Sequence, residues 1–230
     1  MSETMLEARS LCAGYGPTRV VHDLDLVVSA GEVVALLGPN GAGKTTTLLS
    51  LAGEIQPQRG EVLMAGRPVR SPTHRRARAG LGYITEERSV FMQLTVLDNL
   101  RVAGVDARVA MDLFPELQAF GRRKAGDLSG GQQQMLALAR MLARQPTLLL
   151  ADELSLGLAP LVVKRLLAAL RAAADNHRVG VLLVEQHVRQ AMAVADRVYV
   201  LSQGRVTLQG PAAEVRDRID EVEAAYLATA

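Results

Sequence analysis

Hydrophobic and polar positions along the chain alternate with two different periods. Residues 5–9 and 20–28 alternate apolar and polar side chains, a pattern typical of half-buried strands. Continuous apolar runs come later, and these predict strands that are buried on both faces, as in a parallel sheet. The predicted buried strands are VVALLG (33–38), GLGYI (80–84), TLLLAD (147–152) and VGVLLVEQH (179–187).

Helical periodicity follows several of these strands. A helix is predicted to begin near Lys44 and to end at Gly53, since glycine often terminates helices. The period is helical from 95 to 142, and two later helices are predicted at 160–175 and 188–196. Hairpin-like pairs are predicted at GEVLMAGRPV, with its turn at Ala65–Gly66, and at YVLSQGRVTLQG, around Gln203–Gly204.

This order of elements predicts an α/β fold with helices on both faces of the sheet. We expect a single domain over residues 5–230, with a helical subdomain inserted at about 88–142. The basic run HRRARAG (74–80) has no apolar period, and we expect a solvated loop there.

Composition narrows the classes of function. Of the 230 residues, 49% are hydrophobic and 22% charged, as in ordinary globular proteins. A net charge of +2 gives no electrostatic case for a nucleic-acid partner. The only cysteine, Cys12, excludes an internal disulfide and fits a reducing compartment. No apolar run approaches the roughly 20 residues that span a bilayer, so we expect any membrane role to come through a partner. We expect the protein to act on the cytoplasmic side.

The segment GPNGAGKT, residues 38–45, lies between a predicted strand and a predicted helix. Gly41 and Gly43 allow the tight turn in which backbone N–H groups point at phosphate oxygens, and the positive helix end adds to that field. Lys44 is then expected to reach the β- and γ-phosphates, and the Thr45 hydroxyl to bind magnesium. A glycine-rich turn with an incidental lysine is the alternative, but the strand–loop–helix context favours a nucleotide site.

Asp152 and Glu153 follow an apolar strand. Ligands of doubly wound sheets bind at the carboxyl ends of the strands, so Asp152 is expected to hold magnesium. Glu153 is expected to polarise the water that attacks the γ-phosphate. Taken alone, the pair is explained equally well by two solvated acids in a turn; the phosphate loop favours catalysis.

The segment LSGGQQQ, residues 128–134, precedes a long predicted helix. Ser129 stands at the N-cap position, and the two glycines would let an anionic ligand approach the backbone at the helix terminus. By itself the segment is explained by an ordinary N-cap.

Together, GPNGAGKT, LSGGQQQ, LLLADE and VEQH resemble the nucleotide-binding subunit of an ABC transporter, over nearly the whole chain. The resemblance implies a P-loop NTPase ABC ATPase fold: a RecA-like mixed sheet core, an antiparallel β subdomain and an inserted α-helical subdomain. It implies ATP and Mg²⁺ as cofactors. It also implies that two subunits meet head to tail, so that the LSGGQ segment of one closes over ATP held by the other.

The same resemblance assigns roles to individual residues. Tyr15 matches the aromatic residue that stacks on adenine; alone, it would be read as an exposed tyrosine in a turn. His187 matches the switch histidine that contacts the γ-phosphate, as a second catalytic residue beside Glu153; a lone histidine after a buried strand is more often structural. Glu86 stands where most of the family has a glutamine that senses magnesium and touches the permease. The expected ATP contacts are Tyr15, Gly38, Pro39, Asn40, Gly41, Ala42, Gly43, Lys44, Thr45, Thr46, Glu86, Ser129, Gly130, Gly131 and Gln132, and the expected magnesium ligands are Thr45, Glu86 and Asp152.

Further segments resemble the shorter ATP-binding subunit of branched-chain amino acid importers: SVFMQLTVLDNL, LFPEL, SLGLAP and LVEQHVRQAMAVADRVYVL. This implies uptake of branched-chain amino acids or related solutes. The implied partners are a second cassette, permease subunits docked near residues 86–100 and, indirectly, a solute-binding protein. The chain departs from the subfamily at Thr85 and Glu87, in place of proline and glycine, and from the family at Leu154, in place of proline.

Two other functions stay open. A non-transport ABC module typically carries two cassettes or a long coiled-coil insertion, and the sequence has neither. A weakly catalytic regulatory subunit is suggested by Leu154 and by the altered loop at 85–87.

Overall fold

The computed structural model describes residues 3–85, 87 and 89–217. Two sheets organise this part of the chain. The smaller is antiparallel, with strand order β2-β1-β4-β5, and contains β1 (Thr4–Tyr15), β2 (Thr18–Ser29), β4 (Arg59–Met64) and β5 (Arg67–Pro68). The larger has the order β10-β9-β3-β8-β7-β6 and contains β3 (Val33–Leu37), β6 (Leu81–Ile84), β7 (Leu148–Asp152), β8 (Gly180–Glu185), β9 (Arg197–Ser202) and β10 (Arg205–Pro211).

The larger sheet is parallel except for its edge strand β10, which pairs antiparallel with β9. Leu37 at the end of β3 is in register with Glu185 at the end of β8. Asp152 at the end of β7 is in register with Val184. The carboxyl ends of these three strands therefore share one edge, the position at which open α/β sheets bind ligands.

Both faces of the larger sheet are covered, which explains the continuous apolar runs. Val33 and Ala35 point into a core shared with α5 (Gly130–Leu142), α6 (Pro160–His177) and α7 (Val188–Met192). Val34 and Leu36 point to the other side, into a core formed with α1 (Lys44–Ala52) and the antiparallel sheet.

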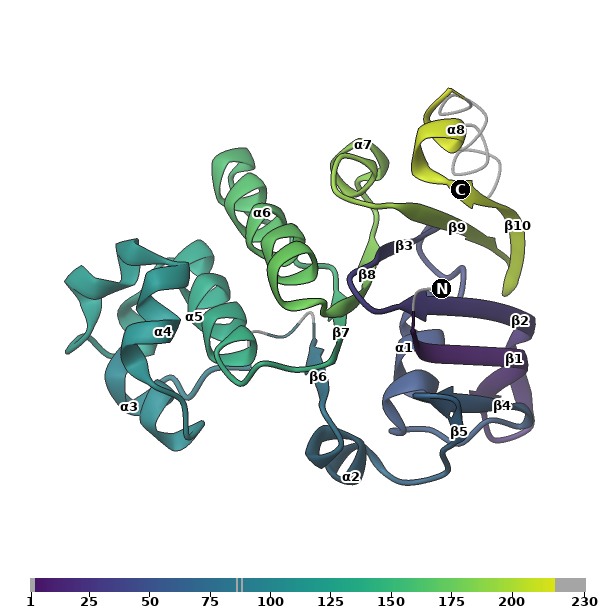
Figure 1. Cartoon of the computed structure of the whole chain (residues 1–230), viewed down its shortest axis with the longest axis horizontal. Coiled ribbons are helices and arrows are strands. Elements are labelled where there is room, and N and C mark those ends of the chain that lie inside the picture. The colour runs from purple at the N-terminus through teal and green to yellow at the C-terminus, as the bar shows by residue number, and fades with distance from the viewer. Residues whose placement is uncertain (1–2, 86, 88, 218–230) are drawn as a thin grey trace.

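The chain between β6 and β7 forms a helical lobe, at one end of the long axis in Figure 1, with α1 and the antiparallel sheet at the other end. The lobe contains α3 (Val96–Val102), α4 (Ala107–Leu113), two 3₁₀ turns, Pro115–Phe120 and Ala125–Asp127, and α5. The predicted α/β architecture, with a mixed sheet core, an antiparallel β subdomain and an inserted helical subdomain, is thus confirmed. No helix within the described residues is long and apolar enough to cross a membrane.

The prediction of a solvated loop at 74–80 is wrong. Residues Thr73–Arg78 form helix α2, and the Arg76 side chain is 1% exposed. Its guanidinium donates to the carbonyls of Leu51 at 2.7 Å and Ser71 at 2.8 Å, and so caps the C-terminal end of α1. A buried arginine, rather than an apolar stripe, anchors this helix. The short α8 (Ala212–Arg216) was likewise not predicted.

Candidate nucleotide-binding site

The loop between β3 and α1 has the backbone that its glycines allow. Gly41 and Gly43 have φ of 79° and 102°, which lie in the left-handed region that favours glycine. Gly38 is needed for another reason, because a Cβ there would lie 2.4 Å from the carbonyl oxygen of Leu201. A tight loop, which glycine allows at these positions, therefore leads directly into the first turn of α1.

Lys44 is the first residue of α1, and its ammonium group bonds back to this loop. Its side chain is 4% exposed, and Nζ donates to the carbonyl oxygens of Gly38 at 2.9 Å and Pro39 at 3.1 Å. Burial lowers the pKa of Lys44, while the nearby carboxylates of Glu153 and Asp152 oppose that shift. Phosphate oxygens would offer this buried ammonium group stronger, charged acceptors than the loop carbonyls.

The other residues of the predicted loop divide into exposed and buried groups. Asn40, Gly41 and Thr45 are exposed, and Pro39 is half-buried. Ala42 is buried in the core with the antiparallel sheet, and Thr46 is buried in the first turn of α1. Thr45 is therefore accessible from solvent, whereas Ala42 packs into the core.

Asp152 and Glu153 come to the same edge of the sheet as Lys44. Asp152 is 3% exposed at the end of β7. It also lies near Tyr83 of β6: burial is the main cause that raises the pKa of Tyr83, and the Asp152 charge adds to it. Glu153 Oε1 lies 3.7 Å from Lys44 Nζ. The structure thus brings together a buried ammonium group and two carboxylates.

The backbone of Glu153 has a φ of 47°, an uncommon value for a residue with a side chain. Its N–H donates to the carbonyl of Val184 at 2.9 Å, which ties it to β8. Leu154, which stands where the family usually has proline, is 2% exposed and belongs to the core under the helices. The residue in the place of the family's proline is thus held by packing in the core.

Two residues at the end of β8 belong to this site and were not singled out from the sequence. Glu185 is 1% exposed and accepts hydrogen bonds from the N–H and Oγ of Ser155, at 3.0 Å and 2.6 Å. Burial raises the pKa of Glu185, and the bonds from Ser155 oppose the shift. Gln186 Nε2 donates to Glu153 Oε2 at 2.8 Å. The sequence signal that could have identified them is their position at the end of an apolar run, where the strand reaches the edge of the sheet.

The segment around Ser129 is a complete capping box. Ser129 Oγ accepts from the N–H of Gln132 at 3.3 Å, and the Gln132 side chain accepts from the N–H of Ser129 at 2.9 Å. Gly131 has a packing reason, since a Cβ there would lie 3.0 Å from Val162 of α6. Gly130 is half-buried at the start of the helix. This confirms the predicted N-cap, and Figure 1 shows α5 in the helical lobe, apart from α1.

The remaining predicted residues are Tyr15, His187 and Glu86. Tyr15, at the end of β1, is 51% exposed. His187 is exposed at the N-cap position of α7, and its side chain caps no N–H there. Glu86 lies outside the described residues.

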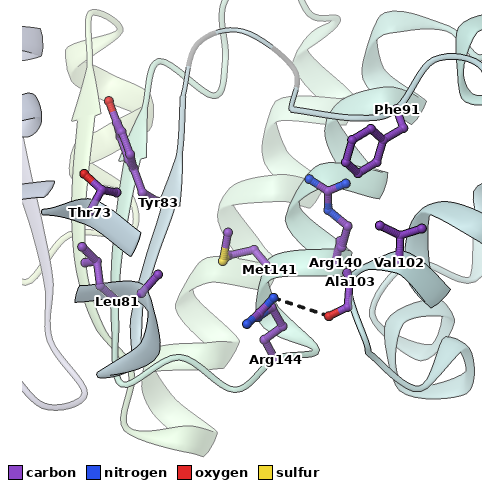
Figure 2. Close-up of a pocket in the computed structure, with 10 residues that line it drawn as sticks. Thr73, Leu81, Tyr83, Phe91, Val102, Ala103, Arg140, Met141 and Arg144 are labelled. Carbon is purple, nitrogen blue, oxygen red and sulfur yellow. Dashed lines mark hydrogen bonds between the residues drawn. The ribbon is translucent and has the colours of Figure 1, made fainter. Parts of the chain in front are cut away.

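A separate groove of about 400 Å³ lies between α2 and β6 on one side and α3 and α5 on the other. Figure 2 shows Leu81 and Tyr83 on one wall and Phe91, Arg140 and Val102 on the opposite wall. The Arg140 guanidinium lies 5.5 Å from the Phe91 ring centroid, a cation–π distance. The groove is thus apolar with a basic component.

A phosphate-type loop before α1, with carboxylates at the ends of β7 and β8, defines a P-loop nucleoside triphosphatase. The model of the ABC transporter family matches residues 21–155. The chain therefore belongs to the ABC transporter ATP-binding cassette family, whose members bind and hydrolyse ATP.

Relatives at similar identity carry two kinds of name. BraG of Pseudomonas aeruginosa, a high-affinity branched-chain amino acid transport ATP-binding protein, is 39% identical, covering 97% of this chain and 99% of its own. LivF of Archaeoglobus fulgidus, a probable branched-chain amino acid transport ATP-binding protein, is 37% identical over 92% and 94%. LptB of Acidithiobacillus ferridurans, a lipopolysaccharide export ATP-binding protein, is 38% identical over 94% of each chain. A solved ATP-binding subunit of an ABC transporter superposes with a TM-score of 0.83 at 28% identity, covering 97% and 99%.

Proposed function

We propose that this chain is the ATP-hydrolysing subunit of an ABC importer for branched-chain amino acids or related solutes. The observation that carries the catalytic part is the convergence of Lys44, Asp152 and Glu153 at one sheet edge. The resemblance of the chain over nearly its full length to BraG and LivF supports the importer part.

In this proposal the residues of the site have separate roles in binding and hydrolysing ATP. The N–H groups of the glycine loop and the Lys44 ammonium group bind the phosphates. Glu153 orients the attacking water and takes its proton, with Oε1 on the Lys44 side. The exposed Tyr15 side chain stacks on adenine.

Magnesium fits the donors that are present. The Thr45 hydroxyl and the Asp152 carboxylate are hard oxygen ligands, the type that Mg²⁺ prefers. When bound, the ion would neutralise phosphate charge; these two residues would hold it. The third predicted ligand, Glu86, lies outside the described residues.

We further propose that two cassettes close over ATP head to tail. The segment from Ser129 to Gln132 lies in the helical lobe, whereas Lys44 begins α1 at the other side of the larger sheet. A segment so placed in one chain is available to the loop of a second cassette, and the α5 N-terminus offers a positive helix end to its phosphates. The second cassette is either another copy or a different subunit.

The groove of Figure 2 is the proposed docking site for a permease. Phe91 and Val102 on its helical wall are 51% and 62% exposed, so two large apolar side chains are accessible on the same wall. An apolar helix end with an acidic residue would match both the apolar walls and Arg140. Docking there would place the chain peripherally on the cytoplasmic face of the membrane.

Export of a lipopolysaccharide is the second candidate, since LptB is as similar as the amino acid cassettes. The two are separated by reconstituting the chain with its permeases in proteoliposomes. Uptake of labelled leucine that depends on a solute-binding protein supports the importer; ATP-driven extraction of lipopolysaccharide, without leucine uptake, supports the exporter.

Two substitutions test the ATP site. Glu153→Gln removes the base but keeps the size of the side chain, so it should keep ATP binding, lower kcat by roughly 10²–10⁴-fold and accumulate an ATP-bound dimer. Lys44→Ala should instead weaken ATP binding. Both are measured as ATP hydrolysis and nucleotide affinity of the purified chain. Hydrolysis at the parent rate in Glu153→Gln, or unchanged affinity in Lys44→Ala, contradicts the assigned role.

A further inference from the structure

Two consecutive side chains at the carboxyl end of β8 hold the loop that carries Glu153. The Glu185 carboxylate accepts the hydrogen bonds that the N–H and the hydroxyl of Ser155 donate. Ser155 lies two residues beyond Glu153. Gln186, the residue after Glu185, donates to Glu153 itself. The first contact holds the backbone of the loop, and the second holds the side chain that the proposed chemistry needs.

The two oxygens of the Glu153 carboxylate have different surroundings. Oε2 accepts the Gln186 amide at 2.8 Å. Oε1 lies on the side of Lys44, 3.7 Å from Nζ. A carboxylate with one oxygen held cannot rotate freely about its last bond. The Gln186 bond thus leaves Oε1 directed toward the phosphate-binding lysine.

We propose that Gln186 is a positioning residue for Glu153, a role distinct from the γ-phosphate contact that the sequence resemblance gave to His187. Among the described residues, Gln186 rather than His187 makes the hydrogen bond to Glu153. His187 lies one residue further, exposed at the start of α7. The proposal rests on the proposed ATPase site, because it concerns how its base is oriented.

Several contacts hold the Glu153 backbone without Gln186. The Glu153 N–H bonds to Val184, Leu154 is buried in the core, and Ser155 bonds to Glu185. These contacts maintain the left-handed φ of Glu153. Gln186 is half-buried and its amide bonds to the end of the Glu153 side chain, so its removal should leave the fold intact. Its effect should therefore be seen in turnover rather than in stability.

The test compares variants of position 186 in the full-length chain, with ATP hydrolysis measured over a range of ATP concentrations. Gln186→Ala should lower kcat by roughly ten- to a hundredfold, because a misoriented catalytic group costs about that much, while KM for ATP stays within about twofold. Gln186→Glu has the same size but sets a carboxylate against Glu153, so kcat should fall at least as far. Gln186→His restores a ring N–H donor and should recover much of the rate.

Gln209→Ala, on the exposed edge strand β10, is the matched control and should keep the parent kcat and KM. Parent kcat in Gln186→Ala, or a loss of kcat in His187→Ala without one in Gln186→Ala, overturns the proposal. The proposal is also overturned if the fall in kcat comes with a comparable loss of ATP affinity, or with a Tm clearly below that of the parent. Glu153→Gln in the same assay separates the two levels: if it keeps the parent rate, the proposed site fails together with this inference, whereas loss in Glu153→Gln alone rejects only the role of Gln186.

Discussion

The Glu185 side chain is almost completely removed from water, and its two oxygens accept the hydrogen bonds of Ser155. Burial raises its pKa above the ordinary 4.5; the Glu153 charge acts in the same direction, whereas Ser155 and His187 oppose it. The folded protein thus binds this proton more tightly than the unfolded chain. The stabilising contribution is complete below pH 4.5 and is lost as pH rises through the folded pKa.

Glu185→Gln removes this titration. We therefore expect the free energy of unfolding of the parent, minus that of the variant, to decrease as pH rises from about 4.5 and to level off above the folded pKa. Urea unfolding of both proteins at a series of pH values measures this difference. A difference that is constant with pH, or that increases, would show that the burial of Glu185 does not control its protonation.

Residues of the candidate site were predictable from the sequence only where a local motif contained them. Lys44 and the pair Asp152–Glu153 follow apolar strands in a recognisable order, and the structure brings them together. Gln186 was not predictable in the same way. Which of two consecutive polar residues faces Glu153 depends on how β8 ends beside β7, and no local pattern reports that geometry.

At the scale of elements, α2 depends on one side chain. The Arg76 guanidinium donates to carbonyls at the end of α1, and burial lowers its pKa. Arg76→Met keeps much of the side-chain volume but leaves those carbonyls without their donor, so it should lower the free energy of unfolding by about 2–3 kcal/mol. Chemical denaturation measures the loss.

Arg78→Met is the control for this change, because Arg78 lies exposed on the same helix. It should alter stability by no more than about 0.5 kcal/mol. Equal losses in the two variants would mean that α2 contributes through its surface charge and not through the cap on α1.

The buried helices and central strands were predicted from their apolar pattern, which α2 lacks. Helices α5 and α6 bury a continuous apolar face, and β3, β7 and β8 are apolar on both faces, so the hydrophobic period alone identified them. Helix α2 has six residues, and its buried side chain is an arginine. A basic run of this kind is indistinguishable from a solvated loop until its hydrogen-bond partners are known.

At the scale of the whole molecule, the ATP site and the groove of Figure 2 are separate surfaces that share β6. Tyr83 lines the groove, and its pKa responds to the Asp152 charge at the sheet edge. A permease seated in the groove would therefore contact a strand that also neighbours Asp152. In the proposed function, β6 thus connects docking with hydrolysis.

The groove makes a prediction that leaves the ATP site untouched. Val102 is 62% exposed on the groove wall, so Val102→Glu should fold normally. A carboxylate buried there against an apolar partner would lose hydration without a matching charge, and we expect co-purification with the permeases to fall about tenfold or more. ATP binding by the chain alone should not change.

Val109 on α4 provides the matched control, since it is an exposed valine of the same helical lobe that does not line the groove. Val109→Glu should retain the permeases at the parent level, because an added charge that stays in water has no desolvation cost. If both variants lose the permeases equally, the cause is the added charge on the lobe. If neither does, the permease docks elsewhere, and the exposed apolar side chains of the groove serve another contact.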